Sequence, residues 1–431
     1  MKRWIMILTM ILCAATATAH NLVPGAKQDH PILLKGGDLY TVKNGVLQQT
    51  DLLFEQGRIS QMGKNLSGPT GTEVIDVTGK RVYPGLIDAA TNLGLVEIGE
   101  VRATRDASEV GTVTPEVQSH IAYNPDSEII PTVRANGITT ALVAPTGGMI
   151  CGRSSLINLD GWTKEDATEK FNVGLHVNWP SASTGWSWSD QRPAEEKRRD
   201  RAEKLKRLDD AFEAAKAYYL AKKVNPNIKV DERWEAMLPV FSKELTVFVN
   251  ADDVRQIAQA VDFAKKWDIK IAIVNGRDSY KVADLLKTNG IPVVYGRVQG
   301  LPMREDEDPD ISSRVPKLLA DAGVKFCLSS SYPNSGSRNL PFQAAQAVAF
   351  DLAPDQALSA LTLTSAEILG VEKDLGSLEV GKKATIVVSD GDILDPPTNR
   401  VIYEFIEGRK VDLDNRGKQL YDKYRQKPSI Q

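Results

Sequence analysis

Short apolar runs alternate with polar, helix-like stretches along the middle of the chain. Residues 252–267, for example, repeat apolar side chains three and four positions apart from Val254 to Ala264, the spacing of an amphipathic helix. Strands that alternate with helices so often favour a (β/α) barrel over an open parallel sheet. A barrel needs an eighth strand, which we expect between residues 147 and 170. Seven apolar runs predict the other buried strands: residues 82–88, 138–144, 172–178, 245–251, 270–275, 291–297 and 324–330.

The two ends of the chain show a different pattern, in which short β-branched or aliphatic runs lie between glycines. Residues 32–34, 39–42 and 52–55 are such runs near the start, and residues 384–388 and 401–406 are their counterparts near the end. This pattern is typical of a small β-sandwich. We therefore expect strands near the end of the chain to pair with strands near its beginning.

A long charged segment at about residues 193–224 interrupts the alternation and predicts a helical insertion, with Pro193 suited to its first turn. One narrow apolar stripe runs along it, and two interpretations of that stripe stay open. The helix packs over the edge of the barrel, or it serves as a lid or a dimer arm. The stripe consists of Leu205, Leu208, Phe212, Ala215 and Tyr219.

The first 19 residues have the pattern of a signal peptide. Lys2 and Arg3 form a basic start, residues 4–15 are apolar but too short to span a bilayer, and residues 17–19 are a small-residue cleavage site. We expect export to the periplasm or the cell exterior, with no membrane span after cleavage. Export permits a disulfide between Cys151 and Cys327, and two buried free thiols are the alternative.

The charge composition of the chain bears on the class of partner. Lys and Arg number 53 and Asp and Glu number 56, which gives a formal net charge of −3, and no long tail carries a single sign of charge. Nothing in this balance indicates a nucleic-acid partner. The 42% apolar content is that of an ordinary globular protein.

The stretch Pro84-Gly85-Leu86-Ile87-Asp88 resembles the opening of the amidohydrolase superfamily barrel, whose first strand reads Pro-Gly-Leu/Phe-Ile-Asp-x-His-x-His. Residues 134–140, 249–276 and 376–382 extend the resemblance over nearly the whole mature chain, closest in character to imidazolonepropionase-like members. The resemblance implies an α/β fold, a distorted TIM (β/α)8 barrel of residues 81–375. It also implies that the barrel is inserted in a composite β-sandwich of residues 20–80 plus 376–431. Members of the family hydrolyse carbon–nitrogen bonds with water activated by zinc or a similar divalent metal.

The resemblance also identifies the positions where metal ligands are expected, and none of them carries one here. The paired first-strand histidines correspond to Ala90 and Asn92, the fifth- and sixth-strand histidines to Asn250 and Asn275, and the eighth-strand aspartate to Ser331. The fourth-strand ligand has no assigned position. Neutral amide and hydroxyl oxygens compete weakly with water for zinc. We therefore expect no metal or other cofactor, and a hydrogen-bonded polar cluster in place of the metal.

Three hypotheses on function stay open, and we favour the first. The chain is a metal-free, catalytically degenerate relative that binds a small-molecule or peptide ligand or a partner. Alternatively, it is an active amide hydrolase whose atypical site uses His176 with Asp88 or Asp252. Finally, it is a non-catalytic subunit of a hetero-oligomer with an active paralogue, and a homo-oligomer is equally open. Whether the chain is an enzyme is thus undecided by its sequence.

Three tryptophans provide the candidate ligand-binding residues. Trp179, Trp186 and Trp188 closely follow the expected strand 172–178, and the carboxyl ends of barrel strands open onto the functional face. A Trp side chain offers a large apolar area with one N–H donor. We expect Trp186 and Trp188 to line the barrel mouth, and packing under the 193–224 helix is the alternative.

Overall fold

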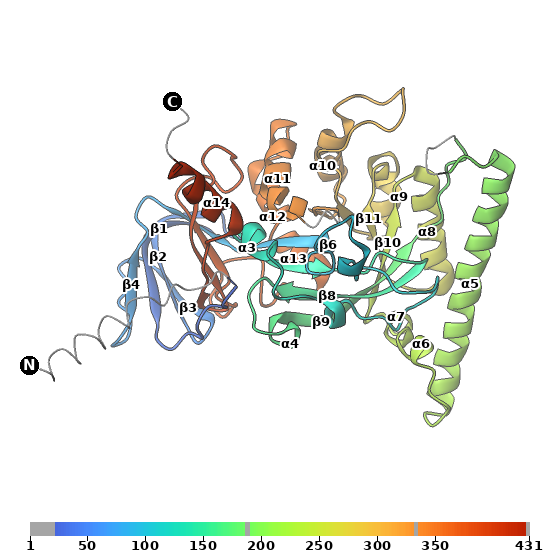
Figure 1. The fold of residues 1–431 in the computed structure, drawn as a ribbon, viewed down its shortest axis with the longest axis horizontal. Coiled ribbons are helices and arrows are strands. Elements are labelled where there is room, and N and C mark those ends of the chain that lie inside the picture. Colours follow the sequence, from blue (N-terminus) through green and yellow to red (C-terminus); the bar gives the residue numbers. More distant parts are fainter. Residues whose placement is uncertain (1–21, 186–189, 332–334, 428–431) are drawn as a thin grey trace, which may run out of the picture.

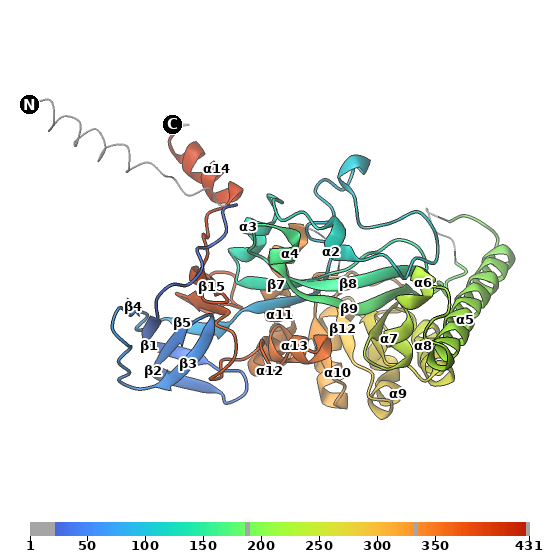
Figure 2. The ribbon, with the colours of Figure 1, turned by 90° about the horizontal axis from the view of Figure 1, so that it is seen from below.

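The computed structural model describes residues 22–185, 190–331 and 335–427, which form two eight-stranded sheets lying end to end (Figure 1, Figure 2). The predicted signal peptide, residues 1–19, lies outside the described residues. The first sheet has the order β16-β15-β14-β5-β1-β2-β3, with β4 paired to β1. Its strands are β1 (Ile32–Tyr40), β2 (Val46–Glu55), β3 (Arg58–Gly63), β4 (Glu73–Asp76), β5 (Arg81–Pro84), β14 (Ile386–Ser389), β15 (Val401–Ile406) and β16 (Arg409–Lys410).

The two ends of the chain share this first sheet. β14 pairs antiparallel with β5, so that Val388 lies opposite Val82. The core between them joins Phe54 to Phe405, whose ring centroids lie 5.0 Å apart. Burial of these apolar side chains is what holds the two distant segments together as one β domain.

The second sheet is a nearly closed barrel, which confirms the predicted α/β barrel fold. Its strands follow one another in sequence order from β6 to β13. Along β10, Val247 and Val249 pack toward the helices, whereas Phe248 packs in the barrel interior. The strands are β6 (Leu86–Thr91), β7 (Ile138–Val143), β8 (Ile150–Asn158), β9 (Thr168–Asn178), β10 (Thr246–Ala251), β11 (Ile271–Asn275), β12 (Val293–Tyr295) and β13 (Phe326–Leu328).

The expected eighth strand is β8, which lies within residues 147–170 as predicted. It differs from the parallel arrangement in one respect, because it runs antiparallel to both β7 and β9. The loop between β7 and β8, residues 144–149, explains this difference. A parallel crossover needs about a dozen residues or more, so this short loop permits only an antiparallel pair.

A carboxylate spans the seam between the two end strands of the barrel, β6 and β13. Asp88 Oδ1 on β6 accepts a hydrogen bond from the backbone N of Ser330, just beyond β13, at 3.0 Å. The hydroxyl of Ser337 lies beside this contact, 2.9 Å from Ser330 Oγ and 3.0 Å from Thr91 Oγ1. Burial raises the pKa of Asp88, against the opposing effect of its Ser330 and Ser337 contacts. Asp88 is fully buried, and its Oδ1 links β6 to the segment that follows β13.

Helices cover the outside of the barrel, and one segment closes its interior. α8 begins with a capping box at Asp253, and α13 contributes Ala366 and Leu369 to the interior core. The helices are η1 (Arg102–Thr104), α2 (Ser119–Ala122), α3 (Ile130–Arg134), α4 (Lys164–Ala167), α5 (Ala194–Val224), α6 (Glu232–Glu235), α7 (Leu238–Phe241), α8 (Val254–Trp267), η2 (Ser279–Val282), α9 (Ala283–Thr288), α10 (Ile311–Ala322), η3 (Ser335–Asn339), α11 (Leu340–Ala349), α12 (Pro354–Ala360), α13 (Leu363–Leu369) and α14 (Arg416–Arg425).

The long helix α5 is the predicted insertion, and it packs along the outer edge of the barrel (Figure 1). Phe212 at the centre of its apolar stripe lies 4.8 Å from Phe263 and 6.2 Å from Phe241, measured between ring centroids. The stripe thus builds a satellite core against α7 and α8. Across the described residues, we find no helix with the length and apolarity that crossing a membrane requires.

Both remaining cysteines are free and buried. Cys151 and Cys327 are therefore unpaired thiols in this structure, the second of the two alternatives. Burial raises the pKa of each thiol to about 12, so neither thiol ionises near neutral pH.

Candidate functional site

Polar side chains from the ends of four strands meet in one line of hydrogen bonds at the barrel mouth. Ser331 Oγ donates to Asn275 Oδ1 at 2.5 Å, and Asn275 Nδ2 donates to Asn250 Oδ1 at 3.2 Å. Asn250 Nδ2 then donates to Asn178 Oδ1 at 2.9 Å. We call Asn178, Asn250, Asn275 and Ser331 the amide chain. All four are half-buried, so solutes at the mouth can reach them.

The amide chain is anchored at one end by backbone carbonyls. Asn178 Nδ2 donates to the carbonyl oxygens of Thr146 and Gly148, both at 2.9 Å. Every donor in the chain points the same way, from Ser331 toward these carbonyls. Hydrogen bonds arranged head to tail polarise one another, which strengthens the line as a whole.

Two members of the amide chain have unusual backbone angles. Asn275 has φ of 70° and Ser331 has φ of 59°, both in the left-handed region. Asn tolerates this region because of its short polar side chain, whereas Ser seldom adopts it. Strain of this kind gathers at binding and catalytic sites, where the surrounding structure holds it in place. The strain therefore supports a functional role for this end of the barrel.

Three of the five predicted ligand positions lie in the amide chain, and two do not. Asn250, Asn275 and Ser331 are brought together, as described above. Ala90 is fully buried in the barrel interior. Asn92 is half-buried, and its Oδ1 has no hydrogen-bond partner among the described residues.

Asn178 is the member of the amide chain that the sequence analysis missed. With β8 counted as the third barrel strand, β9 is the fourth, and Asn178 is its last residue. Asn178 lies directly opposite Asn250 in the register of β9 and β10. This is the fourth-strand position that had no assignment. The sequence predicted a strand before residues 172–178, but it did not show that Asn178 would lie beside Asn250.

His176 lies deeper in the barrel than the amide chain, away from the mouth where the predicted base would act. Its side chain is fully buried and stacks on Phe248, with ring centroids 5.1 Å apart. Neither ring nitrogen has a hydrogen-bond partner among the described residues. Burial lowers the pKa of His176 to about 3, so the ring is neutral at physiological pH. With Asp88 in the strand seam, the predicted pairing of these two groups is not formed.

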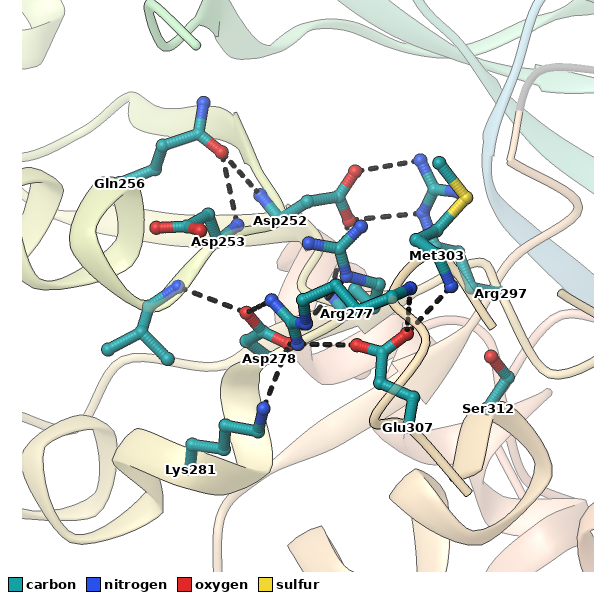
Figure 3. Close-up of polar contacts among 12 residues, drawn as sticks. Asp252, Asp253, Gln256, Arg277, Asp278, Lys281, Arg297, Met303, Glu307 and Ser312 are labelled. Carbon is teal, nitrogen blue, oxygen red and sulfur yellow. Dashed lines mark hydrogen bonds and ion pairs between the residues drawn. The ribbon is translucent and has the colours of Figure 1, made fainter. Parts of the chain in front are cut away.

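Asp252, the third catalytic candidate, belongs to an ionic network beside the mouth (Figure 3). Its carboxylate accepts two hydrogen bonds from Arg297, at 3.0 and 2.7 Å. The loops after β10, β11 and β12 supply this network. Both oxygens of this carboxylate are therefore engaged in charge-assisted hydrogen bonds.

Asp278 is the most buried carboxylate of the network, with a side chain 1% exposed. Burial by itself would raise the pKa of Asp278, but hydrogen bonds and charge from Arg304 together with the charge of Arg277 lower it overall. Arg304 also pairs with Glu307. These arginines carried no signal in the sequence, because nothing in their spacing shows which carboxylates they contact.

The structure describes one of the three candidate tryptophans, Trp179. Trp179 is 6% exposed and packs edge-on against Phe263, with centroids 5.4 Å apart. It therefore belongs to the satellite core under α5, which corrects its assignment as a ligand contact. Trp186 and Trp188 lie outside the described residues.

The residues at the predicted metal positions do not fit a divalent metal. They offer a methyl group, carboxamides and one hydroxyl, and the oxygens of Asn178, Asn250 and Asn275 already accept hydrogen bonds. Over residues 22–185, 190–331 and 335–427, no group of three or more His, Cys, Asp or Glu side chains is placed to hold a metal ion. Carboxamide oxygens in such a site favour hydrogen-bonding partners over zinc.

Comparison with known proteins agrees with the geometry of the fold. The Amidohydrolase family model matches residues 284–413. Imidazolonepropionase of Alkaliphilus metalliredigens is 24% identical, with 92% of each chain covered. Dihydroorotase of Geobacter metallireducens is 39% identical over 62 residues, a match that spans only 15% of that enzyme. The solved structure of an amidohydrolase from Thermotoga maritima MSB8 has a TM-score of 0.78 at 25% identity, with 88% of this chain and 99% of that chain covered.

Proposed function

The chain belongs to the amidohydrolase superfamily, and from that premise we propose that it binds a small polar ligand at its barrel mouth without metal-assisted hydrolysis. The amide chain carries this proposal. It lies where the resemblance implies metal ligands, and it consists of neutral groups that hydrogen-bond one another. Hydrolysis of the family's kind requires a metal-bound water with a pKa of about 7, and these residues supply no ligand set for it.

The amide chain is suited to binding because it has hydrogen-bonding capacity left over. Asn275 Nδ2 uses one of its two N–H groups within the chain. The chain is half-buried, so a ligand can exchange with water there at modest cost. Carboxamides both donate and accept, which favours a ligand with neutral polar groups. His176 and Asp252 give no support to the atypical hydrolase, since one is buried and the other is held by Arg297.

Export is part of the same proposal. The basic and apolar start of the chain supports it, and the two buried free thiols are compatible with any redox compartment. Sequencing of the N-terminus of protein recovered from a periplasmic extract would test it. A mature chain that begins at His20 supports export, and an intact Met1 in that extract contradicts it.

Metal content is the direct test of the metal-free proposal. We expect elemental analysis of purified protein to find no stoichiometric zinc, iron or manganese. The matched variant restores the family ligands through Ala90→His, Asn92→His, Asn250→His, Asn275→His and Ser331→Asp. Metal in the restored variant and none in the parent would show that the barrel has kept the geometry of the metal site and lacks only the ligand side chains. Stoichiometric metal in the parent, removed by Asn250→Ala or Asn275→Ala, would overturn the proposal.

An assay of hydrolytic activity is the second test of the metal-free proposal. Dipeptides, N-acyl amino acids and small lactams should show no hydrolysis above a heat-killed control. Activity that co-purifies with the protein and disappears in His176→Ala would establish the atypical hydrolase instead.

A further inference from the structure

Three arginines lie in the ionic network at the mouth, and two of them are fully engaged (Figure 3). Arg297 donates two hydrogen bonds to Asp252. Arg304 donates two to Asp278, at 2.9 and 2.5 Å, and also pairs with Glu307. Bidentate contacts of this kind satisfy both the charge and the fork geometry of a guanidinium.

Arg277 is the third arginine, and its guanidinium is placed differently. Its one ion pair with the described residues runs from Nε to Asp278 Oδ1 at 3.6 Å, which is too long for a hydrogen bond. Nε is buried and has no hydrogen-bond partner there. The Asp278 carboxylate is already occupied, because it also accepts from the backbone N of Val254 at 3.3 Å. Arg277 is therefore the least completely paired of the three arginines, with one long ion pair where the other two make bidentate hydrogen bonds.

Burying the Arg277 guanidinium without a hydrogen-bonded counter-ion is unfavourable. The Arg277 side chain is only 16% exposed, so it has lost most of its contact with water. A guanidinium that makes no hydrogen bond to its counter-ion in such surroundings costs free energy, which a hydrogen bond to a ligand anion would offset. Lys281, by contrast, lies 3.8 Å from Asp278 with 39% of its side chain exposed, so water solvates its charge.

The position of Arg277 connects it to the amide chain. It follows Asn275 by two residues in the loop after β11, and its backbone N donates to Asp252 Oδ1 at 3.2 Å. Figure 3 shows it between Asp252 and Asp278. We infer that Arg277 binds an anionic group, a carboxylate or a phosphate, of a small ligand whose neutral polar part contacts the amide chain. This inference rests on the proposed ligand-binding function and adds the charge of the ligand to it.

The test uses succinamate, which carries one carboxylate and one amide, and its uncharged twin succinamide. Calorimetric titration of each compound compares wild-type protein with Arg277→Gln and with Arg255→Gln. Arg255 is the matched control, because it pairs with Asp253 at the edge of the network and its side chain is 64% exposed. We expect Arg277→Gln to weaken succinamate binding about tenfold or more, as loss of a charge-assisted contact does. Arg255→Gln should bind succinamate as wild type does, and succinamide should not distinguish the three proteins.

Inorganic phosphate separates the two kinds of anion. Displacement of succinamate by phosphate in wild type shows that the site accepts either anion, and failure of phosphate to displace it assigns the site to carboxylates. Folding is controlled by thermal unfolding. Because Arg277 contacts Asp278 only through a 3.6 Å ion pair, Arg277→Gln should lower the unfolding midpoint by no more than Arg255→Gln does. A larger fall in the midpoint would identify Arg277 as a structural member of the network and overturn the inference.

Two further outcomes would also overturn it: succinamate that fails to bind wild type, or succinamate that binds wild type and Arg277→Gln equally. Asn275→Ala distinguishes this failure from failure of the proposed function. If Asn275→Ala weakens succinamide binding while Arg277→Gln leaves succinamate binding unchanged, the amide chain binds ligand and only the anion assignment is wrong. If Asn275→Ala alters neither ligand, the proposed ligand site itself fails.

Discussion

Two polar clusters in this molecule differ in burial and in charge. The amide chain at the mouth is half-buried and neutral. The second cluster lies where the barrel meets the β domain, and we call Arg134, Asp160, Glu404 and Arg409 the junction cluster. Arg134 Nη1 lies 3.1 Å from Asp160 Oδ1, with side chains 4% and 1% exposed, and Glu404 is completely buried. Arg409 Nε on β16 lies 3.6 Å from Asp160 Oδ2.

This difference indicates that the junction cluster has a structural role and the amide chain a functional one. The junction cluster joins residues from the barrel, the β domain and the N-terminal segment, since Gly25 N also donates to Asp160 at 3.2 Å. Arg134, Asp160 and Glu404 are buried away from solutes, so their role is to fix how the two domains meet. Two of the three hydrogen bonds within the amide chain join strands that already pair through their backbones, β9 with β10 and β10 with β11. The half-buried groups of the amide chain are available to a ligand.

The largest effect should come from breaking the junction. Asp160→Ala leaves Arg134 buried without its carboxylate, whereas Arg409 keeps Asp166 at 3.8 Å, and we expect the loss to destabilise the protein by about 3–5 kcal/mol. Urea unfolding measures this change. Asp321→Ala is the control, because its ion pair with Lys317 joins adjacent turns of α10 and is 59% exposed on the Asp side, worth about 0.5 kcal/mol or less. If the two variants lost equal stability, burial of an ion pair would not determine how much it contributes to the stability of this protein.

The junction should also make stability depend on pH through Glu404. Burial raises the pKa of Glu404 well above its ordinary value, although the charge of Arg134 opposes this shift. The native state thus holds this proton more tightly than the unfolded state. Its contribution is fully present below the unfolded pKa of about 4.3 and is lost as pH rises through the folded pKa.

Glu404→Gln removes that proton equilibrium. The variant should therefore gain stability relative to wild type as pH rises from 5 to 8, and urea unfolding at several pH values would show it. A difference between the two proteins that stays constant with pH would mean that Glu404 is ionised in the folded state. In that case Arg134 would be its true ion-pair partner, and the cluster would resemble an ordinary salt bridge.

The sequence predicted the barrel better than it predicted the contacts at its mouth. Pro84–Asp88 fixed the first strand, and the apolar runs located the other strands, because burial imposes a pattern on each strand separately. Asn178 was missed because its role depends on which strand lies beside β9. Arg277 was missed for a similar reason, since its incomplete pairing follows from the contacts that Arg304 makes with the same carboxylate. Such relations between distant residues have no trace in local sequence.

The smallest effect should come from Ser331 at the end of the amide chain. Ser331→Gly loses one hydrogen bond, worth about 1 kcal/mol, but relieves a left-handed backbone that costs a non-glycine residue roughly 1–2 kcal/mol. These terms nearly cancel, so the stability should stay within about 0.5 kcal/mol of wild type. Ser331→Ala loses the same hydrogen bond and keeps the strain, so it should cost about 1 kcal/mol in urea unfolding. If glycine destabilised as strongly as Asp160→Ala does, the mouth would be as structural as the junction, and the contrast between the clusters would fail. If Ser331→Gly and Ser331→Ala had equal stabilities, the backbone at Ser331 would not be strained. Its left-handed conformation would then no longer support a functional role for the barrel mouth.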